Sequence, residues 1–210
     1  MRLPGHTLPT PPWGRPCGVA LSVVCSRSVS TRPRAVLFDR DGTLVVDVPY
    51  NGDPDAVRAM PGAEVALDRV RAAGVPIGVV SNQSGIARGL LDAGQVEAGN
   101  ARGAEILGPF AVWRWCPHGS DDGCACRKPA PGMVLDAAAA LGVAPADLAV
   151  IGDIAADVGA ADAAGARAVL VPTAATRREE IEDAAARGIL ADDLAGAVTL
   201  LGFRPSGSTP

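Results

Sequence analysis

Two aspartates, Asp39 and Asp41, follow an apolar run at residues 35–38 and precede a turn that contains Gly42. On an extended strand, residues two apart point to the same side, so we expect both carboxylates to face one spot and Arg40 to face away from it. Two carboxylates that share a small space repel each other unless a cation or a proton lies between them. The spacing therefore predicts a site that combines a metal ion with a nucleophile.

A second group of reactive side chains consists of Cys116, His118, Cys124 and Cys126, arranged as C-x-H and C-x-C with five residues between the pairs. Three thiolates and one imidazole complete the ligand set of a structural zinc ion and leave no open position for zinc catalysis. Five cysteines in all are too few and too unevenly placed for a disulfide framework. We expect a zinc-binding loop in a protein of the reducing cytoplasm.

Lys128 follows this loop, next to Arg127, and is the only lysine among 19 basic residues. An ammonium group is a compact point charge that approaches a phosphate singly, whereas a guanidinium presents a planar fork. The stretch SNQSG at residues 81–85 offers a hydroxyl and successive backbone amides, which can cradle phosphoryl oxygens, although loops of this composition are common. Together these features favour a site for a phosphorylated ligand.

Alternating strands and helices must position these residues. The predicted strands occupy residues 35–38, 75–80, 110–115, 148–151 and 168–171, and the predicted helices occupy residues 61–73, 91–107, 131–141 and 155–164. This alternation is typical of an α/β fold, a Rossmann-like three-layer α/β/α sandwich with a mainly parallel sheet. Because ligands bind at the carboxyl ends of such strands, we expect Asp39, Ser81, Cys116 and Asp153 at one rim.

Composition and charge narrow the function further. The net charge of −4 combines five arginines and no acid in residues 1–34 with 14 basic and 23 acidic residues in the remainder, a balance of −9. This excess of acidic residues after residue 34 argues against nucleic-acid binding, which needs a basic face. No apolar run reaches the roughly 20 residues that span a bilayer, so no membrane partner is expected.

One folded domain is predicted over residues 34–202, between a disordered extension at residues 1–33 and a disordered tail at residues 203–210. The extension is rich in Arg, Pro and Ser and contains no acid, which leaves a targeting segment and a start site assigned too far upstream as alternatives. No long insertion separates residues 44 and 61, so a large cap domain is not expected. Tyr50 in this stretch either lines the entrance of the site or is an exposed loop aromatic.

The stretches FDRDGTL, SNQSGIARG, CPHGSDDGCACRKPAPGM and IGDIAAD occur in this order between residues 37 and 157. They resemble the zinc-containing subfamily IIIA of the haloacid dehalogenase superfamily of phosphotransferases. The resemblance implies that Asp39 attacks phosphorus and that Asp41 is the general acid and base. It also implies a Mg²⁺ site formed by the Asp39 carboxylate, the Asp41 backbone carbonyl and Asp153, with charge stabilisation by Lys128.

The resemblance further implies that Ser81, Asn82, Arg88 and Arg127 bind substrate, the two arginines offering cations for a second phosphate. This branch includes D-glycero-D-manno-heptose 1,7-bisphosphate 7-phosphatases and histidinol-phosphate phosphatases. The stretch SNQSGIARG favours removal of the 7-phosphate from the heptose bisphosphate by a monomeric enzyme. Alternatives are the hydrolysis of histidinol phosphate or of another small sugar phosphate, and a non-catalytic zinc-containing binding protein.

Two residues near Asp153, Ile154 and Asp157, are expected to affect the site without binding the metal ion or the substrate. Asp157 is interpreted as an acid of the first helical turn, favoured there by the helix dipole, that mainly supports the site. Ile154 stands where many members of the superfamily carry a basic or polar residue, which leaves the metal ligand intact but changes its surroundings.

Overall fold

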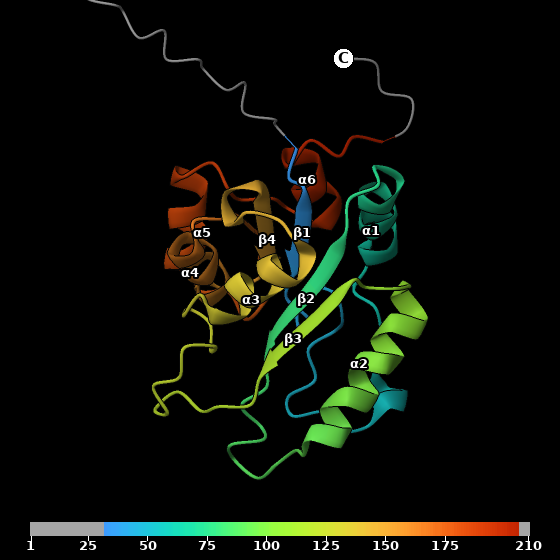
Figure 1. Cartoon of the computed structure of the whole chain (residues 1–210), viewed down its shortest axis with the longest axis vertical. Coiled ribbons are helices and arrows are strands. Elements are labelled where there is room, and N and C mark those ends of the chain that lie inside the picture. The colour runs from blue at the N-terminus through green and yellow to red at the C-terminus, as the bar shows by residue number, and fades with distance from the viewer. Residues whose placement is uncertain (1–31, 206–210) are drawn as a thin grey trace, which may run out of the picture.

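The computed structural model describes residues 32–205, and within them a five-stranded parallel sheet forms the middle layer (Figure 1). Its strands are β1 (Ala35–Phe38), β2 (Ile77–Asn82), β3 (Val112–Cys116), β4 (Leu148–Gly152) and β5 (Arg167–Leu170), in the order β3-β2-β1-β4-β5. The central strand β1 is buried at every position, because helices cover both faces of the sheet. A fully apolar strand such as AVLF is what this environment requires.

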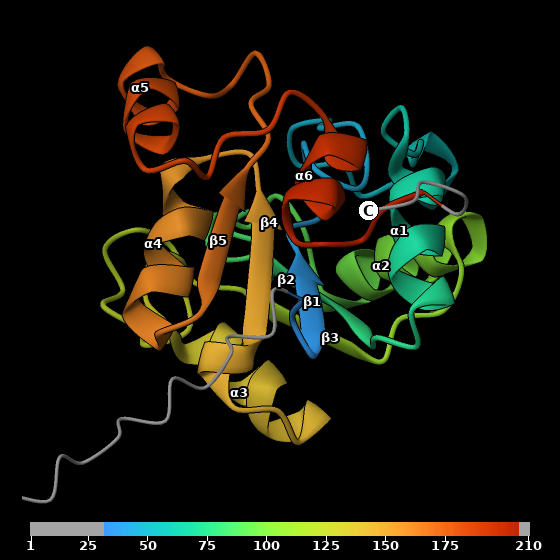
Figure 2. The ribbon, with the colours of Figure 1, turned by 90° about the horizontal axis from the view of Figure 1, so that it is seen from above.

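Helices cover the two faces of the sheet (Figure 2). They are α1 (Ala63–Ala72), α2 (Ala93–Leu107), α3 (Gly132–Leu141), α4 (Ala155–Ala164), α5 (Arg178–Ala186) and α6 (Leu194–Leu200). Residues of α1, α2 and α6 pack on one face in a core that includes Phe38 and Ile151, whereas residues of α3, α4 and α5 pack on the other with Leu37 and Val150. Alternate residues of one strand thus serve opposite cores, and the predicted three-layer sandwich is confirmed.

The strand order reverses beside β1, because the chain moves from β1 outward through β2 and β3 and then returns to β4. The loop after β1 therefore leads to α1 on one face of the sheet, and the loop after β4 leads to α4 on the other face. In open parallel sheets this is where ligands bind.

Most predicted elements agree with the structure, and two match residue for residue, at 35–38 and 155–164. The second of these helices ends at Gly165, which adopts a left-handed conformation (φ 75°) that favours glycine. No element is predicted after residue 171, yet α5 and α6 lie there. Residue Asp193 caps the start of α6 by accepting a hydrogen bond from the backbone of Gly196.

The loop between β1 and α1 is pinned at its base. Val45 forms isolated β-bridges with Asp41 and Ala59, and the backbone N–H of Met60 donates to the carbonyl of Leu44 at 2.9 Å. The rest of the loop contains one 3₁₀ turn, at Pro54–Ala56. Within residues 32–205 no further domain is inserted between the elements of the sandwich, and the sequence analysis likewise expects no large cap domain.

The folded domain extends slightly beyond the predicted limits. Phe203, placed with the tail in the sequence prediction, is 1% exposed and belongs to the core beside α1 and α6. Arg32 donates to the carbonyl of Gly202 at 3.0 Å and lies over the Phe203 ring. Residues 1–31 and 206–210, which hold most of the predicted extension and tail, lie outside the described residues.

Among the helices of residues 32–205, none is long and apolar enough to cross a membrane.

Candidate active site

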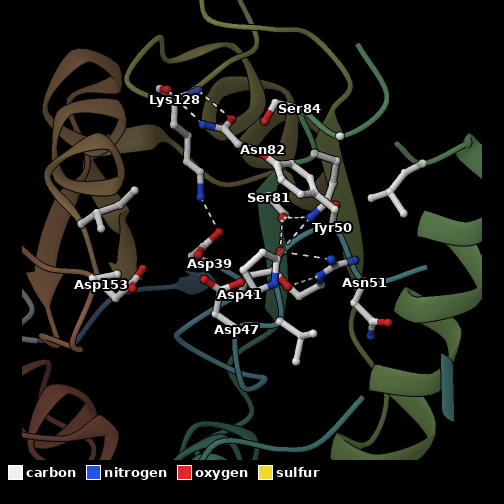
Figure 3. Close-up of a pocket in the computed structure, with 18 residues that line it drawn as sticks. Asp39, Asp41, Asp47, Tyr50, Asn51, Ser81, Asn82, Ser84, Lys128 and Asp153 are labelled. Atoms are coloured by element: carbon white, nitrogen blue, oxygen red, sulfur yellow. Dashed lines mark hydrogen bonds and ion pairs between the residues drawn. The ribbon is translucent and has the colours of Figure 1, made fainter. Parts of the chain in front are cut away.

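A cavity of about 300 Å³ opens at the carboxyl ends of β1, β2 and β4 (Figure 3). Its walls come from the turn after β1, the loop toward α1, the end of β2 with its following loop, the segment with Lys128 that precedes α3, and the loops that follow β4 and β5. The residues that line it include Asp39, Arg40, Asp41, Asp47, Tyr50, Asn51, Ser81, Asn82, Gln83, Lys128, Asp153 and Ile154. The structure thus brings together most of the predicted site at one rim.

Lys128 lies at the centre of the acidic side chains. Its Nζ is 2.5 Å from Asp39 Oδ1 and 2.5 Å from Asp157 Oδ1, and it donates to the carbonyl of Val80 at 2.8 Å. All three hydrogens of the ammonium group therefore have partners. Lys128, Asp39 and Asp157 are each at least nine-tenths buried, so these ion pairs are shielded from solvent. The only lysine of the chain neutralises the predicted nucleophile.

Burial and mutual repulsion shift the pKa values of this group. Burial raises the pKa of Asp39 well above its usual range, with Lys128 opposing the shift and Asp157 adding to it. Burial and the charge of Asp157 raise the pKa of Asp153 to about 6, while a hydrogen bond from Thr173 opposes that shift. Burial alone would lower the pKa of Lys128, but Asp157 and Asp39 outweigh it and raise the pKa above its ordinary value. A buried lysine stays charged here because it has two carboxylate partners.

The charges in this cluster do not balance. Carboxylate oxygens of Asp39, Asp153 and Asp157 lie within 4.8 Å of one another, and the three residues are buried. One ammonium group compensates only one of the three negative charges. Hard carboxylate oxygens with an excess of negative charge are suited to a divalent cation such as Mg²⁺. The residues present therefore fit the predicted metal.

Asp41 is held by a separate set of partners. Arg40 donates from Nε to Asp41 Oδ1 at 3.0 Å and pairs through Nη2 with Oδ2 at 3.0 Å. Gln83 Nε2 donates to the same Oδ2 at 2.8 Å, and Arg40 Nη1 donates to Asn100 Oδ1 of α2 at 2.8 Å. The carboxylate is thus clamped by a bidentate guanidinium, one of the strongest neutralising geometries.

The expected orientation of Arg40 is wrong. Arg40 does not face away from Asp41, because β1 ends at Phe38 and strict alternation of side chains stops before the two residues. The chain turns instead through Gly42, whose φ is 80°, and the long arginine side chain lies against the neighbouring carboxylate. Periodicity of an extended strand applies only within the strand.

Asn82 binds the main chain of Lys128 as well as lining the cavity. Its side-chain nitrogen donates to the carbonyl of Lys128 at 3.1 Å, and its Oδ1 accepts from the Lys128 N–H at 3.0 Å. The Lys128–Pro129 peptide bond next to it is cis. Asn82 therefore positions Lys128, a part that sequence reasoning did not assign to it. Ser81, on the same strand, accepts from Gln83 Nε2 at 2.7 Å.

Arg88 and Arg127 are not among the residues that line the cavity. Arg88 donates to the hydroxyl of Tyr50 at 2.5 Å and lies over its ring, which places both at the rim of the entrance. Tyr50 itself lines the cavity and is 42% exposed, so both alternatives for it hold in part. Arg127 donates to the carbonyl of His118 at 3.2 Å and so binds the loop of the four predicted zinc ligands.

The four predicted zinc ligands converge between β3 and α3. The sulfur atoms of Cys116, Cys124 and Cys126 are 3.0–3.6 Å apart, and His118 Nδ1 lies 3.2 Å from Cys126 Sγ. A tetrahedral ion with zinc–sulfur bonds of about 2.3 Å needs sulfur atoms about 3.8 Å apart. The three thiols are free rather than joined in disulfides. The sulfur atoms lie closer together than this zinc geometry requires, but their convergence with His118 and the donor set fit a structural zinc ion.

Asp157 and Gln83 are the site residues that sequence reasoning undervalued. Asp157 does act as a first-turn acid, because its Oδ2 accepts from the N–H of Ile154 at 3.2 Å, but its other oxygen binds Lys128. Its position in the fourth stretch, IGDIAAD, was the available signal. Gln83 follows Ser81 by two residues on the same side, and only its place in SNQSG marks it.

Comparison with known proteins agrees with this geometry. A family model described as HAD-hydrolase-like matches residues 125–197. A D-glycero-β-D-manno-heptose-1,7-bisphosphate 7-phosphatase of Pseudomonas aeruginosa is 36% identical over 171 residues, which cover 79% of this chain and 96% of that protein. The corresponding enzyme of Bordetella bronchiseptica is 37% identical over 150 residues, which cover 69% of this chain and 84% of the relative.

A solved structure of a relative has the same fold as this chain. The crystal structure of the D,D-heptose 1,7-bisphosphate phosphatase of B. bronchiseptica, complexed with magnesium and phosphate, superposes with a TM-score of 0.68 at 33% identity and covers 80% of this chain and 97% of that one. The fold and the site define a hydrolase of the haloacid dehalogenase type. The chain belongs to this superfamily, in the branch that contains the D-glycero-β-D-manno-heptose-1,7-bisphosphate 7-phosphatases.

Proposed function

We propose that the protein is a Mg²⁺-dependent phosphomonoesterase that works through an aspartyl-phosphate. The single observation that carries the proposal is the buried contact of Lys128 with Asp39 beside two further carboxylates. Asp39 attacks phosphorus, a bond forms between its carboxylate oxygen and phosphorus, and the bond to the sugar oxygen breaks. Asp41 supplies a proton to the leaving alcohol and later takes one from the water that hydrolyses the aspartyl-phosphate. Lys128 offsets the charge on Asp39 and on the transferring group.

The proposed metal ligands are the carboxylates of Asp39 and Asp153 and the backbone carbonyl of Asp41. The excess negative charge of the buried cluster supports a divalent cation there, and the related B. bronchiseptica structure is complexed with magnesium and phosphate. A bound Mg²⁺ would stabilise negative charge on the phosphoryl oxygens. The protein's own contribution is to hold the carboxylates together in a dry site, which the burial of Asp39 and Asp153 provides.

A structural zinc ion is proposed at Cys116, His118, Cys124 and Cys126. All four protein ligands are used, so no position is open for substrate. The zinc loop runs directly into Arg127 and Lys128, and Arg127 binds the carbonyl of His118. The ion would therefore fix the start of the segment that carries Lys128.

The proposed substrate is D-glycero-β-D-manno-heptose 1,7-bisphosphate, from which the 7-phosphate is removed. The names of relatives that this chain matches at 36–37% identity support it. Arg88 and Arg127 are proposed to bind the second phosphate, although in the structure Arg88 is paired with Tyr50 and Arg127 with His118. A monomeric enzyme remains part of the proposal, and the free thiols at the zinc site support a cytoplasmic location.

Release of inorganic phosphate from the heptose bisphosphate tests this proposal, with histidinol phosphate as the competing substrate. We expect turnover of the bisphosphate with Mg²⁺ present and a loss of at least about 100-fold in Asp39→Asn, which keeps the shape but removes the nucleophile. Asp53→Asn, an exposed acid that caps the short 3₁₀ turn, is the matched control. Activity that survives in Asp39→Asn, or faster turnover of histidinol phosphate, would refute the corresponding assignment.

A further inference from the structure

The loop that follows β5 reaches back to Asp153 at the end of β4. Thr173 Oγ1 donates to Asp153 Oδ2 at 2.9 Å, and Thr176 Oγ1 donates to the backbone carbonyl of Asp153 at 2.6 Å. The loop therefore binds both the side chain and the main chain of a single residue. That residue is a proposed metal ligand, and it is 5% exposed.

Further hydrogen bonds fix the direction of the Thr173 hydroxyl. The N–H of Ala175 donates to Thr173 Oγ1 at 3.2 Å, so the hydroxyl oxygen is used as an acceptor and its hydrogen is directed to Asp153. The N–H of Thr173 donates to Thr176 Oγ1 at 2.7 Å, which closes the loop on itself. The following helix is anchored nearby, because Glu180 Oε2 accepts from the N–H of Ala155 at 3.2 Å. The loop is thus a braced element of the site.

Asp153 is confined from the opposite side as well. A Cβ placed on Gly42 would lie 2.5 Å from Asp153 Oδ2, so this oxygen packs against the backbone of the turn that carries Asp39 and Asp41. The Oδ2 atom thus contacts both the backbone of Gly42 and the hydroxyl of Thr173. Figure 3 shows Asp153 beside Asp39 at the edge of the pocket.

We propose that Thr173 is a positioning residue for the metal ion: it binds Oδ2 of Asp153 and thereby presents Oδ1 to the divalent cation. This inference rests on the proposed Mg²⁺ site. Without the Thr173 hydroxyl, the Asp153 carboxylate gains rotational freedom that it loses again when the ion binds. Partners that orient a metal ligand typically contribute about 10–100-fold to metal affinity.

A purely structural part for Thr173 makes a different prediction. The hydroxyl also accepts from Ala175, so its removal would loosen the loop and lower the melting temperature of the metal-free protein. It would leave the Mg²⁺ concentration needed for half-saturation unchanged. The test therefore has to measure Mg²⁺ dependence itself.

The experiment compares the full chain with Thr173→Val, which keeps the shape and loses the hydroxyl, and with Thr173→Ser, which keeps the hydroxyl. Thr173→Ala replaces the valine variant if that variant does not fold. Thr199→Val is the matched control, because Thr199 donates within α6, to the carbonyl of Ala195. Each protein is titrated with Mg²⁺ in buffers free of chelator, so that bound zinc stays in place. The melting temperature without substrate and the initial rate of phosphate release are both recorded.

We expect Thr173→Val to need at least about tenfold more Mg²⁺ for half of the change in either readout, and Thr173→Ser and Thr199→Val to stay near the wild type. Equal half-saturating concentrations in Thr173→Val and the wild type would overturn the inference. A wild-type melting temperature that does not respond to Mg²⁺ would overturn the proposed metal site together with it. A thermal response that depends on Thr173 in a protein that releases no phosphate would support the inference and overturn the proposed function.

Discussion

Asp153 carries a stability cost that a single substitution should remove. Its carboxylate is buried beside Asp157, and these two effects raise its pKa from 3.8 to about 6. The native protein therefore holds a proton at Asp153 more tightly than the unfolded chain does. The sign of the linkage follows: this contribution to stability is present below about pH 3.8 and is lost as the pH rises through about 6.

The pKa difference sets the size of the effect. At about 1.4 kcal/mol for each tenfold change in proton affinity, a rise from 3.8 to about 6 corresponds to about 3 kcal/mol. At pH 7.5 without divalent cations, Asp153→Asn should therefore raise the free energy of unfolding by up to about 3 kcal/mol. At pH 5 about half of that gain should remain. Asparagine keeps an oxygen that can accept from Thr173, so this hydrogen bond need not be lost.

Urea unfolding followed by circular dichroism at pH 7.5 and pH 5, in buffers without chelator, measures both values. The wild type with saturating Mg²⁺ is the second comparison, because the cation should stabilise the wild type and not Asp153→Asn. The same variant should lose Mg²⁺-dependent phosphatase activity. The reasoning is refuted if Asp153→Asn is no more stable than the metal-free wild type at pH 7.5, or if its gain does not shrink toward pH 5.

The other predictions concern Lys128 and the zinc loop. Lys128→Met leaves two buried carboxylates without their cation. We therefore expect the free energy of unfolding, measured with urea, to fall by about 3–5 kcal/mol, and kcat, measured by phosphate release, to fall by about 100-fold or more. An unchanged kcat would contradict the proposed charge stabilisation by Lys128. Cys124→Ser should lower the zinc content per chain, the melting temperature and kcat together, as measured by elemental analysis, thermal unfolding and kinetics. Cys25→Ser, outside the four-ligand set, should change none of them, and a Cys124→Ser protein with wild-type melting and kinetics would rule out a structural zinc ion.

The sheet and the rim could be predicted because their signals are local. An apolar tetrapeptide followed by acids and glycine marks β1, and a left-handed glycine marks the end of α4. The rule that parallel strands present ligands at their carboxyl ends then brings Asp39, Ser81 and Asp153 together before any contact is known. Periodicity and chain order suffice for this part.

Pairings between distant side chains could not be predicted in the same way. The contact of Lys128 with Asp157 depends on how the α4 amino terminus meets the loop after the zinc ligands, and either residue has an ordinary local explanation. Arg88 has cation chemistry suited to a phosphate, but only the fold shows that Tyr50 lies within reach of it. Such contacts depend on the relative placement of loops, for which a single sequence carries no repeating pattern.

The two ends of the loop between β1 and α1 are joined by backbone bridges, so protein engineering can change the loop between them. Because Val45 and Ala59 are bridged to each other, residues 46–58 begin and end at one place, and their length is not coupled to the sheet. Each doubling of such a loop costs only about 0.6 kcal/mol in closure entropy. Libraries that vary the length and composition of residues 46–56 would therefore reshape the mouth of the cavity, where Asp47, Tyr50 and Asn51 lie, while the core residue Val57 and the proposed reacting groups, which lie outside this segment, are kept.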